Sequence, residues 1–275
     1  MTAWSILGLV PKPAGRIVSG DIIYQGESLL EKTSAEMREI RGGGICMVMQ
    51  DPLTSLNPVF NIGNQLMESL QMESHEPKRS LRQKAIDLLA SVRIPAAETR
   101  LDNFPHQMSG GMRQRVVGAI AIARSPNILI ADEPTTSLDA TIQLQYLRLL
   151  KDIQAETGAA IIFITHDFGI VARMCDRVAV MYAGKMVEQA DVESLFDNPA
   201  HPYSEALLQS VPDIDLEVDF LPSIEGQPPT LDDLPDGCAF APRCPYAFEK
   251  CNEFPLEFVV GPEHTALCWR HAHEG

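Results

Sequence analysis

Two adjacent carboxylates, Asp132 and Glu133, end the apolar run "NILIADEP" at residues 127–134. An apolar run of this length is typical of a strand buried inside a sheet, and parallel sheets bind ligands beyond the carboxyl ends of their strands. One carboxylate in that place can hold Mg²⁺ for phosphoryl transfer, while its neighbour orients or deprotonates a water molecule. Taken alone, the pair is better explained as an exposed acidic turn after a core strand.

Further polar groups stand at comparable places along the chain. Ser109, Gly110 and Gly111 precede the apolar segment "VVGAIAIA", which predicts a helix start whose N–H groups suit a phosphate. His166 follows the apolar run "AAIIFIT", and Gln50 follows "ICMVM". Each of these, by itself, is also explained as a plain helix cap or a structural polar residue. Their convergence on one sheet edge favours a site for a nucleotide phosphate.

Four cysteines form a second group with possible chemistry. Cys238, Cys244, Cys251 and Cys268 have the spacing C-x5-C-x6-C-x16-C within the final 38 residues. Four thiols grouped in this way indicate a metal site. The C-x2-C pairs typical of zinc are missing, and the longer loops favour an iron–sulfur cluster over zinc. Reduced cysteines packed in a loop without any metal are the alternative.

Hydrophobic periodicity predicts the elements that must position these groups. Strands alternating with helices indicate an α/β fold with a mostly parallel sheet. Residues 213–236 carry eight carboxylates and neither Lys nor Arg, a composition typical of an extended linker. The predicted elements are a helix at 1–10, paired strands at 15–29, a capped helix at 34–41, buried strands at 45–50, 127–134 and 159–167, helices within 61–101, a helix with apolar positions 142, 146, 149, 150 and 153, and a strand or hairpin at 177–189.

Composition narrows the class of protein. The 275 residues allow one large domain or two smaller ones. A formal net charge of -15 argues against binding to a nucleic-acid backbone. No apolar run approaches the roughly 18 residues of a membrane span, and the start lacks the features of a signal peptide. These observations predict a cytosolic setting, where thiols stay reduced.

The whole set resembles the nucleotide-binding subunit of ATP-binding cassette (ABC) transporters. "ILIADE" is similar to the Walker B strand and "MSGGM" is similar to the signature motif. "SLD", which contains Asp139, is similar to the D-loop. Gln50 resembles the Q-loop glutamine, and His166 resembles the switch histidine. The stretches "MQDPLTSLNPVFNIGNQLME", "EPTTSLDATIQLQ" and "HPYSEALLQSVP" resemble the dipeptide/oligopeptide importer subgroup. Met112 stands where many cassette proteins have Gln, as is frequent in this subgroup.

The resemblance implies the P-loop NTPase (RecA-like) fold of the ABC ATPases. It predicts an ATPase core at 1–53 and 112–212, an inserted helical subdomain at 54–111 that carries the signature motif, and a C-terminal extension at 213–275. Implied partners are membrane permease subunits, a second ATPase subunit in a hetero- or homodimer, and indirectly a substrate-binding protein. The implied location is peripheral, at the cytoplasmic face of the inner membrane.

The resemblance also implies a role for each residue, with ATP and Mg²⁺ as ligands. Two protomers would share each ATP, because the signature motif of one closes over the nucleotide of the other. In that scheme Asp132 holds Mg²⁺ with help from Gln50, Glu133 acts on the attacking water, and His166 contacts the γ-phosphate. The signature residues Ser109, Gly110 and Gly111 cover the ATP of the opposite subunit. Asp139 couples the two sites. Some resembling subunits also carry an iron–sulfur cluster in the extension, here a [4Fe-4S] cluster with zinc as the alternative.

One expected motif does not occur in the sequence. The phosphate loop Gly-x-x-x-x-Gly-Lys-Ser is not found, whereas "MTAWSILGLVP" is similar to the residues that follow this loop in the resembling subunits. We therefore expect Met1 to lie one residue past the loop, with the loop strand missing. Since each charge-assisted contact to phosphate is worth about 1.5–3 kcal/mol, the loss would remove most of the affinity for ATP. One explanation is that the start of the reading frame is placed too late, and the retained Glu133 and His166 favour it. The alternative is an assembly subunit that cannot bind ATP.

Overall fold

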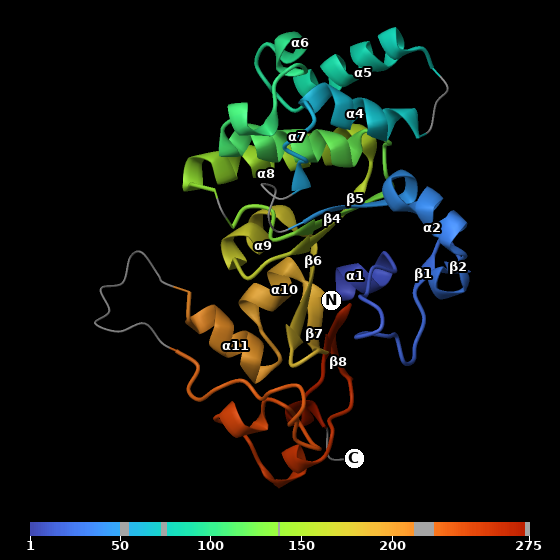
Figure 1. The fold of residues 1–275 in the computed structure, drawn as a ribbon. Helices are drawn as coiled ribbons and strands as arrows, with labels where there is room; N and C mark the ends of the chain where they lie inside the picture. The colour runs from blue at the N-terminus through green and yellow to red at the C-terminus, as the bar shows by residue number, and fades with distance from the viewer. Residues whose placement is uncertain (50–54, 73–75, 137, 212–222, 273–275) are drawn as a thin grey trace. The chain divides into compact units, whose positions relative to one another are not determined.

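The protein is described by a computed structural model of residues 1–275, in which the placement of residues 50–54, 73–75, 137, 212–222 and 273–275 is not described (Figure 1). The described chain divides into two compact units, Met1–His166 and Asp167–Gly275. None of its described helices combines the length and the apolar character that a membrane crossing requires.

A parallel sheet of three strands forms the centre of the first unit. The strands β3 (Ile45–Val48), β4 (Ile128–Asp132) and β5 (Ala160–Ile164) lie in the order β3-β4-β5. Ile45 pairs with Ile128, and Asp132 pairs with Ile164. The three apolar runs of the sequence therefore produce the strands that they predict, and all three strands end at the same edge.

Helices and one small hairpin surround this sheet (Figure 1). The short helix α2 begins at a capping box in which Thr33 and Glu36 satisfy each other's backbone N–H groups. The strands β1 and β2 pair across a turn at Gln25 and Gly26, which both have positive φ. The elements are α1 (Thr2–Ile6), β1 (Ile23–Tyr24), β2 (Glu27–Ser28), α2 (Ser34–Glu39), α4 (Ile62–Gln71), α5 (Lys78–Ser91), α6 (Ala97–Arg100), α7 (Gly110–Ile122) and α8 (Ala140–Thr157).

The helix predicted at residues 1–10 is shorter than expected. It ends at Ile6, with Leu7 as its C-cap, and Gly8 adopts φ of +60°. A glycine in the left-handed region just after a helix is a common stop signal, so Gly8 ends the helix before Pro11 and Pro13 are reached.

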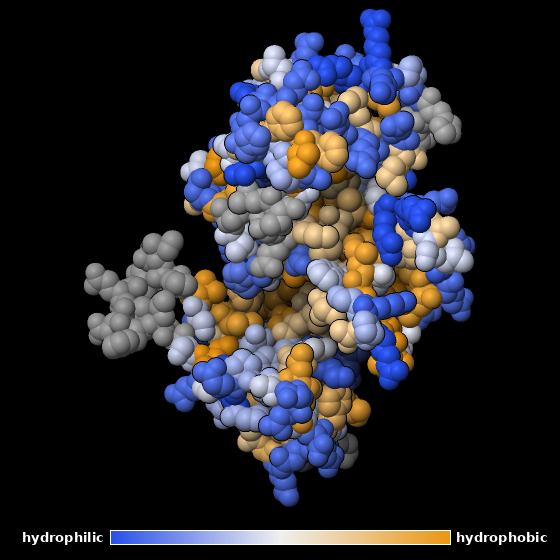
Figure 2. All heavy atoms as spheres, in the orientation of Figure 1, coloured by the Kyte–Doolittle hydropathy of each residue, from blue (hydrophilic) through white to orange (hydrophobic). Residues whose placement is uncertain are grey.

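The buried side chains of the first unit form a core beside the sheet. Ala3 and Leu7, from α1 and its C-cap, and Met37 from α2 pack with Ile45 of β3 and Ile130 of β4. Farther along the chain, the helices α4, α5 and α7 bury leucine and valine side chains. Figure 2 shows mostly hydrophilic residues over the visible surface of α5 and α6. This helical segment is therefore amphipathic, with its apolar side turned inward.

The strand β5 differs from its prediction in one respect. Its sequence indicates a strand buried on both faces, yet Ala160 and Ile162 are exposed. In the described sheet β5 pairs only with β4, so it lies at an edge. An apolar run does not distinguish a central strand from an edge strand.

The second unit contains an antiparallel sheet in the order β6-β7-β9-β8. Its first two strands form a hairpin, one of the two possibilities expected for residues 177–189, and Glu188 of β7 pairs with Ala266 of β9. The cysteine-containing tail thus extends a sheet that begins before the acidic segment. The elements are α9 (Phe168–Met174), β6 (Arg177–Tyr182), β7 (Lys185–Asp191), α10 (Val192–Asp197), α11 (Pro202–Gln209), β8 (Phe258–Gly261) and β9 (His264–Ala266).

Candidate functional site

The two predicted carboxylates lie at the carboxyl end of β4. Asp132 is the last residue of the strand and is half-buried. Burial raises the pKa of its carboxyl group above the ordinary value, the neighbouring charge of Glu133 raises it further, and the amino terminus at Met1 opposes the shift. Helix α1 therefore starts near this carboxylate. Glu133 follows with φ of +43°, and its N–H donates to the carbonyl oxygen of Ile164 at 2.9 Å.

His166 and Glu133 are brought together at this edge. The Nδ1 atom of His166 lies 3.3 Å from Oε1 of Glu133. The side chain of His166 is 74% exposed and that of Glu133 is 25% exposed, so the histidine lies on the open side. The other carboxylate oxygen, Oε2, accepts a hydrogen bond from Thr136 Oγ1 at 3.1 Å. Glu133 is thus held between a ring nitrogen and a hydroxyl, which fixes the direction of its carboxylate.

Asp132 has the chemistry that Mg²⁺ requires. Magnesium prefers carboxylate oxygen and is usually held by one or two protein carboxylates together with substrate phosphates. Among the described residues there is no group of three or more His, Cys, Asp and Glu side chains that could hold a metal ion by themselves. A single half-buried carboxylate at a sheet edge fits an ion that the nucleotide shares.

Ser109, Gly110 and Gly111 form the start of α7, as predicted. The Ser109 hydroxyl accepts a hydrogen bond from the Met112 N–H at 3.3 Å and caps the helix. A Cβ atom added at Gly110 would meet nothing within 4 Å, whereas one at Gly111 would lie 2.9 Å from Cγ2 of Ile142. Gly111 is therefore required for the close approach of α7 and α8, and packing gives no reason for a glycine at position 110.

Asp139 begins α8 as its N-cap. Its Oδ1 atom accepts hydrogen bonds from the N–H groups of Thr141 at 3.1 Å and Ile142 at 3.0 Å. The carboxylate therefore has a local structural role at the helix start, in addition to any role toward a partner. Gln50, the remaining predicted residue of this group, lies outside the described residues.

Two residues of this region were missed by sequence reasoning. Thr136 orients Glu133 from three positions farther along the chain. Gln114 is fully buried in α7, and its amide donates to the carbonyl oxygen of Pro134. Gln114 stands between Arg113 and Arg115, so nothing in the local sequence signals that its side chain is buried.

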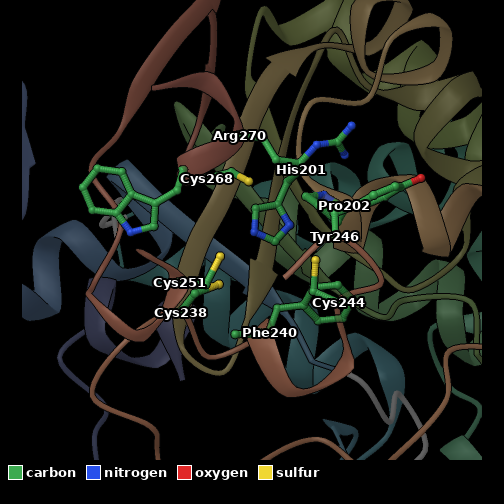
Figure 3. A pocket seen from close by; sticks show the side chains of 11 residues that line it. His201, Pro202, Cys238, Phe240, Cys244, Tyr246, Cys251, Cys268 and Arg270 are labelled. Atoms are coloured by element: carbon green, nitrogen blue, oxygen red, sulfur yellow. The ribbon is translucent and has the colours of Figure 1, made fainter. Parts of the chain in front are cut away.

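The four cysteines line one cavity in the second unit. Figure 3 shows the sulfur atoms of Cys238, Cys244, Cys251 and Cys268 around a shared space, with the ring of His201 beside them. The backbone N–H of Cys238 donates to the carbonyl oxygen of Cys251 at 2.9 Å, which brings two of these loops together. The sequence spacing therefore correctly predicted a group, although the described residues contain no set with the arrangement of a metal centre. The iron–sulfur cluster and the zinc alternative are not confirmed.

Burial favours the protonated thiol at Cys238, Cys244 and Cys268. It raises the pKa of Cys238 and Cys244, and it raises the pKa of Cys268 to about 11. The neighbouring thiols raise these pKa values further, while the Arg270 guanidinium lowers those of Cys244 and Cys268. Thiolates at these positions would therefore need a compensating cation such as a metal.

A buried carboxylate holds the loop that carries His201. Glu188 is 1% exposed and accepts hydrogen bonds from the N–H groups of Ala200 at 2.7 Å and His201 at 2.9 Å. Nε2 of His264 lies 2.8 Å from the same carboxylate. Nδ1 of His201 accepts from the Tyr203 N–H at 3.0 Å, so this ring faces the cysteine cavity in a fixed orientation.

Comparisons with known families match both units. Residues 4–136 match the family model described as ABC transporter, and residues 187–251 match the model described as oligopeptide/dipeptide transporter, C-terminal region. The second match includes Cys238, Cys244 and Cys251.

Individual relatives match nearly the whole chain. A probable peptide ABC transporter ATP-binding protein of Sinorhizobium fredii is 50% identical over 98% of this chain and 81% of its own length. A dipeptide transport ATP-binding protein of Bacillus subtilis is 46% identical over 98% of this chain and 81% of its own length. An oligopeptide transport ATP-binding protein of the same organism is 46% identical over 100% of this chain and 84% of its own length.

Solved structures support the same fold. The dimeric ATP-binding cassette MJ0796 bound to ADP and Pi is 25% identical, with a TM-score of 0.59 over 70% of this chain and 79% of that chain. The cbiO1 protein of Clostridium perfringens is 28% identical, with a TM-score of 0.60 over 72% of this chain and 74% of that chain. The predicted α/β fold of ABC ATPase type is confirmed. The expectation that Met1 directly follows a phosphate loop, with its strand missing, is not confirmed.

Proposed function

The chain belongs to the family of ATP-binding subunits of peptide ABC transporters, and from this membership we propose that Asp132, Glu133 and His166 form its hydrolytic group. As an ABC-type ATPase, the subunit energises the import of di- or oligopeptides. The single observation that supports the assignment of residues is the contact between His166 and Glu133, next to Asp132 at the end of β4.

Each of these side chains suits a separate task in hydrolysis. Bound Mg²⁺, held by Asp132 and assisted by Gln50, would neutralise charge on the ATP phosphates. Glu133 orients or deprotonates the attacking water, because its carboxylate is fixed by Thr136 and His166. His166 contacts the γ-phosphate from the open side of the pair, since most of its side chain is exposed.

The start of α7 supplies a second half-site. Ser109, Gly110 and Gly111 cover the ATP of a second ABC ATPase subunit, identical or not. Their support is the open space at Gly110 and the position of the N–H groups at a helix start. Asp139, at the start of α8, couples the two sites of the dimer.

The partners follow from the same family membership. Residues 54–111 form the helical subdomain that receives the membrane permease subunits, and residues 213–275 form the extension beyond the ATPase core of 1–53 and 112–212. A substrate-binding protein takes part only indirectly, and the subunit works peripherally at the cytoplasmic face of the inner membrane. The relatives support an importer ATPase over the assembly subunit that the sequence left as the alternative.

Glu133→Gln tests the hydrolytic assignment in the assembled transporter. We expect ATP turnover at the site containing this residue to fall at least about 100-fold, as expected when a general base is lost, while bound nucleotide is retained. Glu156→Gln, an exposed substitution in α8, is the control and keeps the full rate. Unchanged turnover with Glu133→Gln would contradict the assignment of Glu133 to hydrolysis.

The four cysteines are the basis of a second proposal, an iron–sulfur cluster with zinc as the alternative. Its support is the gathering of four thiols around one cavity. Protein purified without oxygen should contain iron and acid-labile sulfide, and Cys251→Ser should lower both, whereas Cys46→Ala in β3 should not. Protein that contains zinc alone, or neither metal, would contradict the cluster.

A further inference from the structure

A buried glutamine connects the signature helix to the turn that carries Glu133. Gln114 in α7 is 0% exposed. Its Nε2 atom donates a hydrogen bond to the carbonyl oxygen of Pro134, the residue directly after Glu133. A buried amide that reaches a backbone carbonyl 20 positions away holds two elements in a defined register, because leaving either group unpaired would be costly.

The turn that Gln114 contacts has an unusual backbone. Glu133 has φ of +43°, which is uncommon for a residue other than glycine and persists only where the surroundings hold it. On the β5 side, the Glu133 N–H donates to Ile164. On the α7 side, the hydrogen bond from Gln114 fixes the Pro134 carbonyl. The direction of the Glu133 carboxylate therefore depends on contacts at both ends of the turn.

A third element meets the same amide. Tyr146 of α8 is fully buried; burial raises the pKa of its phenol, and the nearby Gln114 amide works against this shift. A Cβ atom at Gly118 of α7 would lie 3.5 Å from the Tyr146 hydroxyl oxygen, an ordinary van der Waals distance, so this hydroxyl lies against α7 near Gly118. Within the described residues, neither Oε1 of Gln114 nor the Tyr146 hydroxyl has a hydrogen-bond partner. The Gln114 side chain lies close enough to the Tyr146 hydroxyl to influence it, and a hydrogen bond from this hydroxyl to Oε1 of Gln114 is part of the proposal that follows.

We propose that Gln114 is a positioning residue for ATP hydrolysis, acting through Pro134 on the Glu133 carboxylate and, with Tyr146, joining the turn to the helices that begin at Ser109 and Asp139. This rests on the proposed function. A side chain that fills the same volume without an N–H donor keeps the packing but releases the Pro134 carbonyl. The amide is therefore required for alignment rather than for packing.

Gln114→Met separates alignment from packing in the assembled transporter. We expect kcat for ATP hydrolysis to fall about tenfold, which is about 1.4 kcal/mol in the barrier. The KM for ATP should change less than about twofold, because Gln114 does not touch the nucleotide. The matched control is Gln145→Met, which removes an exposed glutamine of α8 and its hydrogen bond from Arg115 Nη2 at 2.8 Å, and it should leave kcat unchanged.

A double-variant cycle shows whether Gln114 acts through Glu133. In the Glu133→Gln background, Gln114→Met should cause no further loss, because residues that act as a unit are not additive. An equal loss in both backgrounds would show a general structural effect and would overturn the proposal. If Glu133→Gln itself has no effect, the proposed function fails instead, so the two failures are distinguishable.

Tyr146→Phe provides a second variant that keeps the ring in place. It removes only the hydroxyl beside the Gln114 amide, and we expect kcat to fall about threefold with an unchanged melting temperature. Should Gln114→Met fail to fold, this variant decides the question alone. If Gln114→Met is folded, an unchanged kcat for this variant overturns the proposal. If it does not fold, an unchanged kcat for Tyr146→Phe overturns the proposal.

Discussion

The two neighbouring glycines of the signature stretch should respond in opposite ways to alanine. A Cβ atom at Gly111 would lie 2.9 Å from Cγ2 of Ile142, well inside ordinary van der Waals contact, so α7 and α8 must separate or Ile142 must move. Overpacking of this kind typically costs about 1–3 kcal/mol. Alanine at Gly110 meets nothing within 4 Å. Both variants gain up to about 1 kcal/mol from helix propensity.

Because the propensity gain is shared, the difference between the two variants isolates the close contact. We expect Gly111→Ala to be less stable than Gly110→Ala by about 1–3 kcal/mol, measured as a shift of the urea midpoint of the full chain without nucleotide. Ile142→Ala in the Gly111→Ala background should recover part of this loss through coupling between the two positions. Equal midpoints for Gly110→Ala and Gly111→Ala would refute the argued packing of α7 on α8.

Three further predictions concern the second unit. Glu188→Gln places an amide against two backbone N–H donors and His264. We expect it to lower the free energy of unfolding, measured with urea, by about 3–5 kcal/mol. The control Glu193→Gln, at an exposed position, should cost less than about 0.5 kcal/mol. Gly237→Ala puts a Cβ atom 2.3 Å from the Cys251 carbonyl oxygen, and we expect the cysteine thiols to react faster with a thiol reagent than in the unsubstituted chain. Burial lowers the pKa of His201 from 6.5 to about 4, with Glu188 opposing the shift. The stability that the neutral, buried His201 ring contributes is therefore present above pH 6.5 and lost as the pH falls toward 4. In metal-free protein, His201→Gln should flatten the pH dependence of the melting temperature in this window.

The end of the sheet proposed to be catalytic could be predicted because its signals are local. The run that becomes β4 is apolar until Asp132, and the turn after it must place Asp132 and Glu133 at the carboxyl edge. His166 was placed at the same edge by the same reasoning. The parallel register, which pairs Asp132 with Ile164, is what converts these separate strand ends into neighbours.

Other features depend on contacts between distant positions and have no local signal. The pairing of β9 with β7 crosses the acidic segment, and nothing in the tail alone indicates its partner. Ala160 and Ile162 are exposed because β5 has only one neighbour in the described sheet, although their run reads as buried. In contrast, the early end of α1 was readable, because Gly8 is a stop signal that stands before the prolines.

The positive φ of Glu133 explains why a buried polar residue belongs in this core. An apolar side chain at position 114 would satisfy the packing of α7, but the Pro134 carbonyl would then be buried without a partner. Pro134 itself has no N–H group, so the turn is fixed through its carbonyl and through the Glu133 N–H on the opposite side. The role proposed for Glu133, to orient a water molecule, requires this two-sided support, since an error of about 1 Å in position can cost about 100-fold in rate.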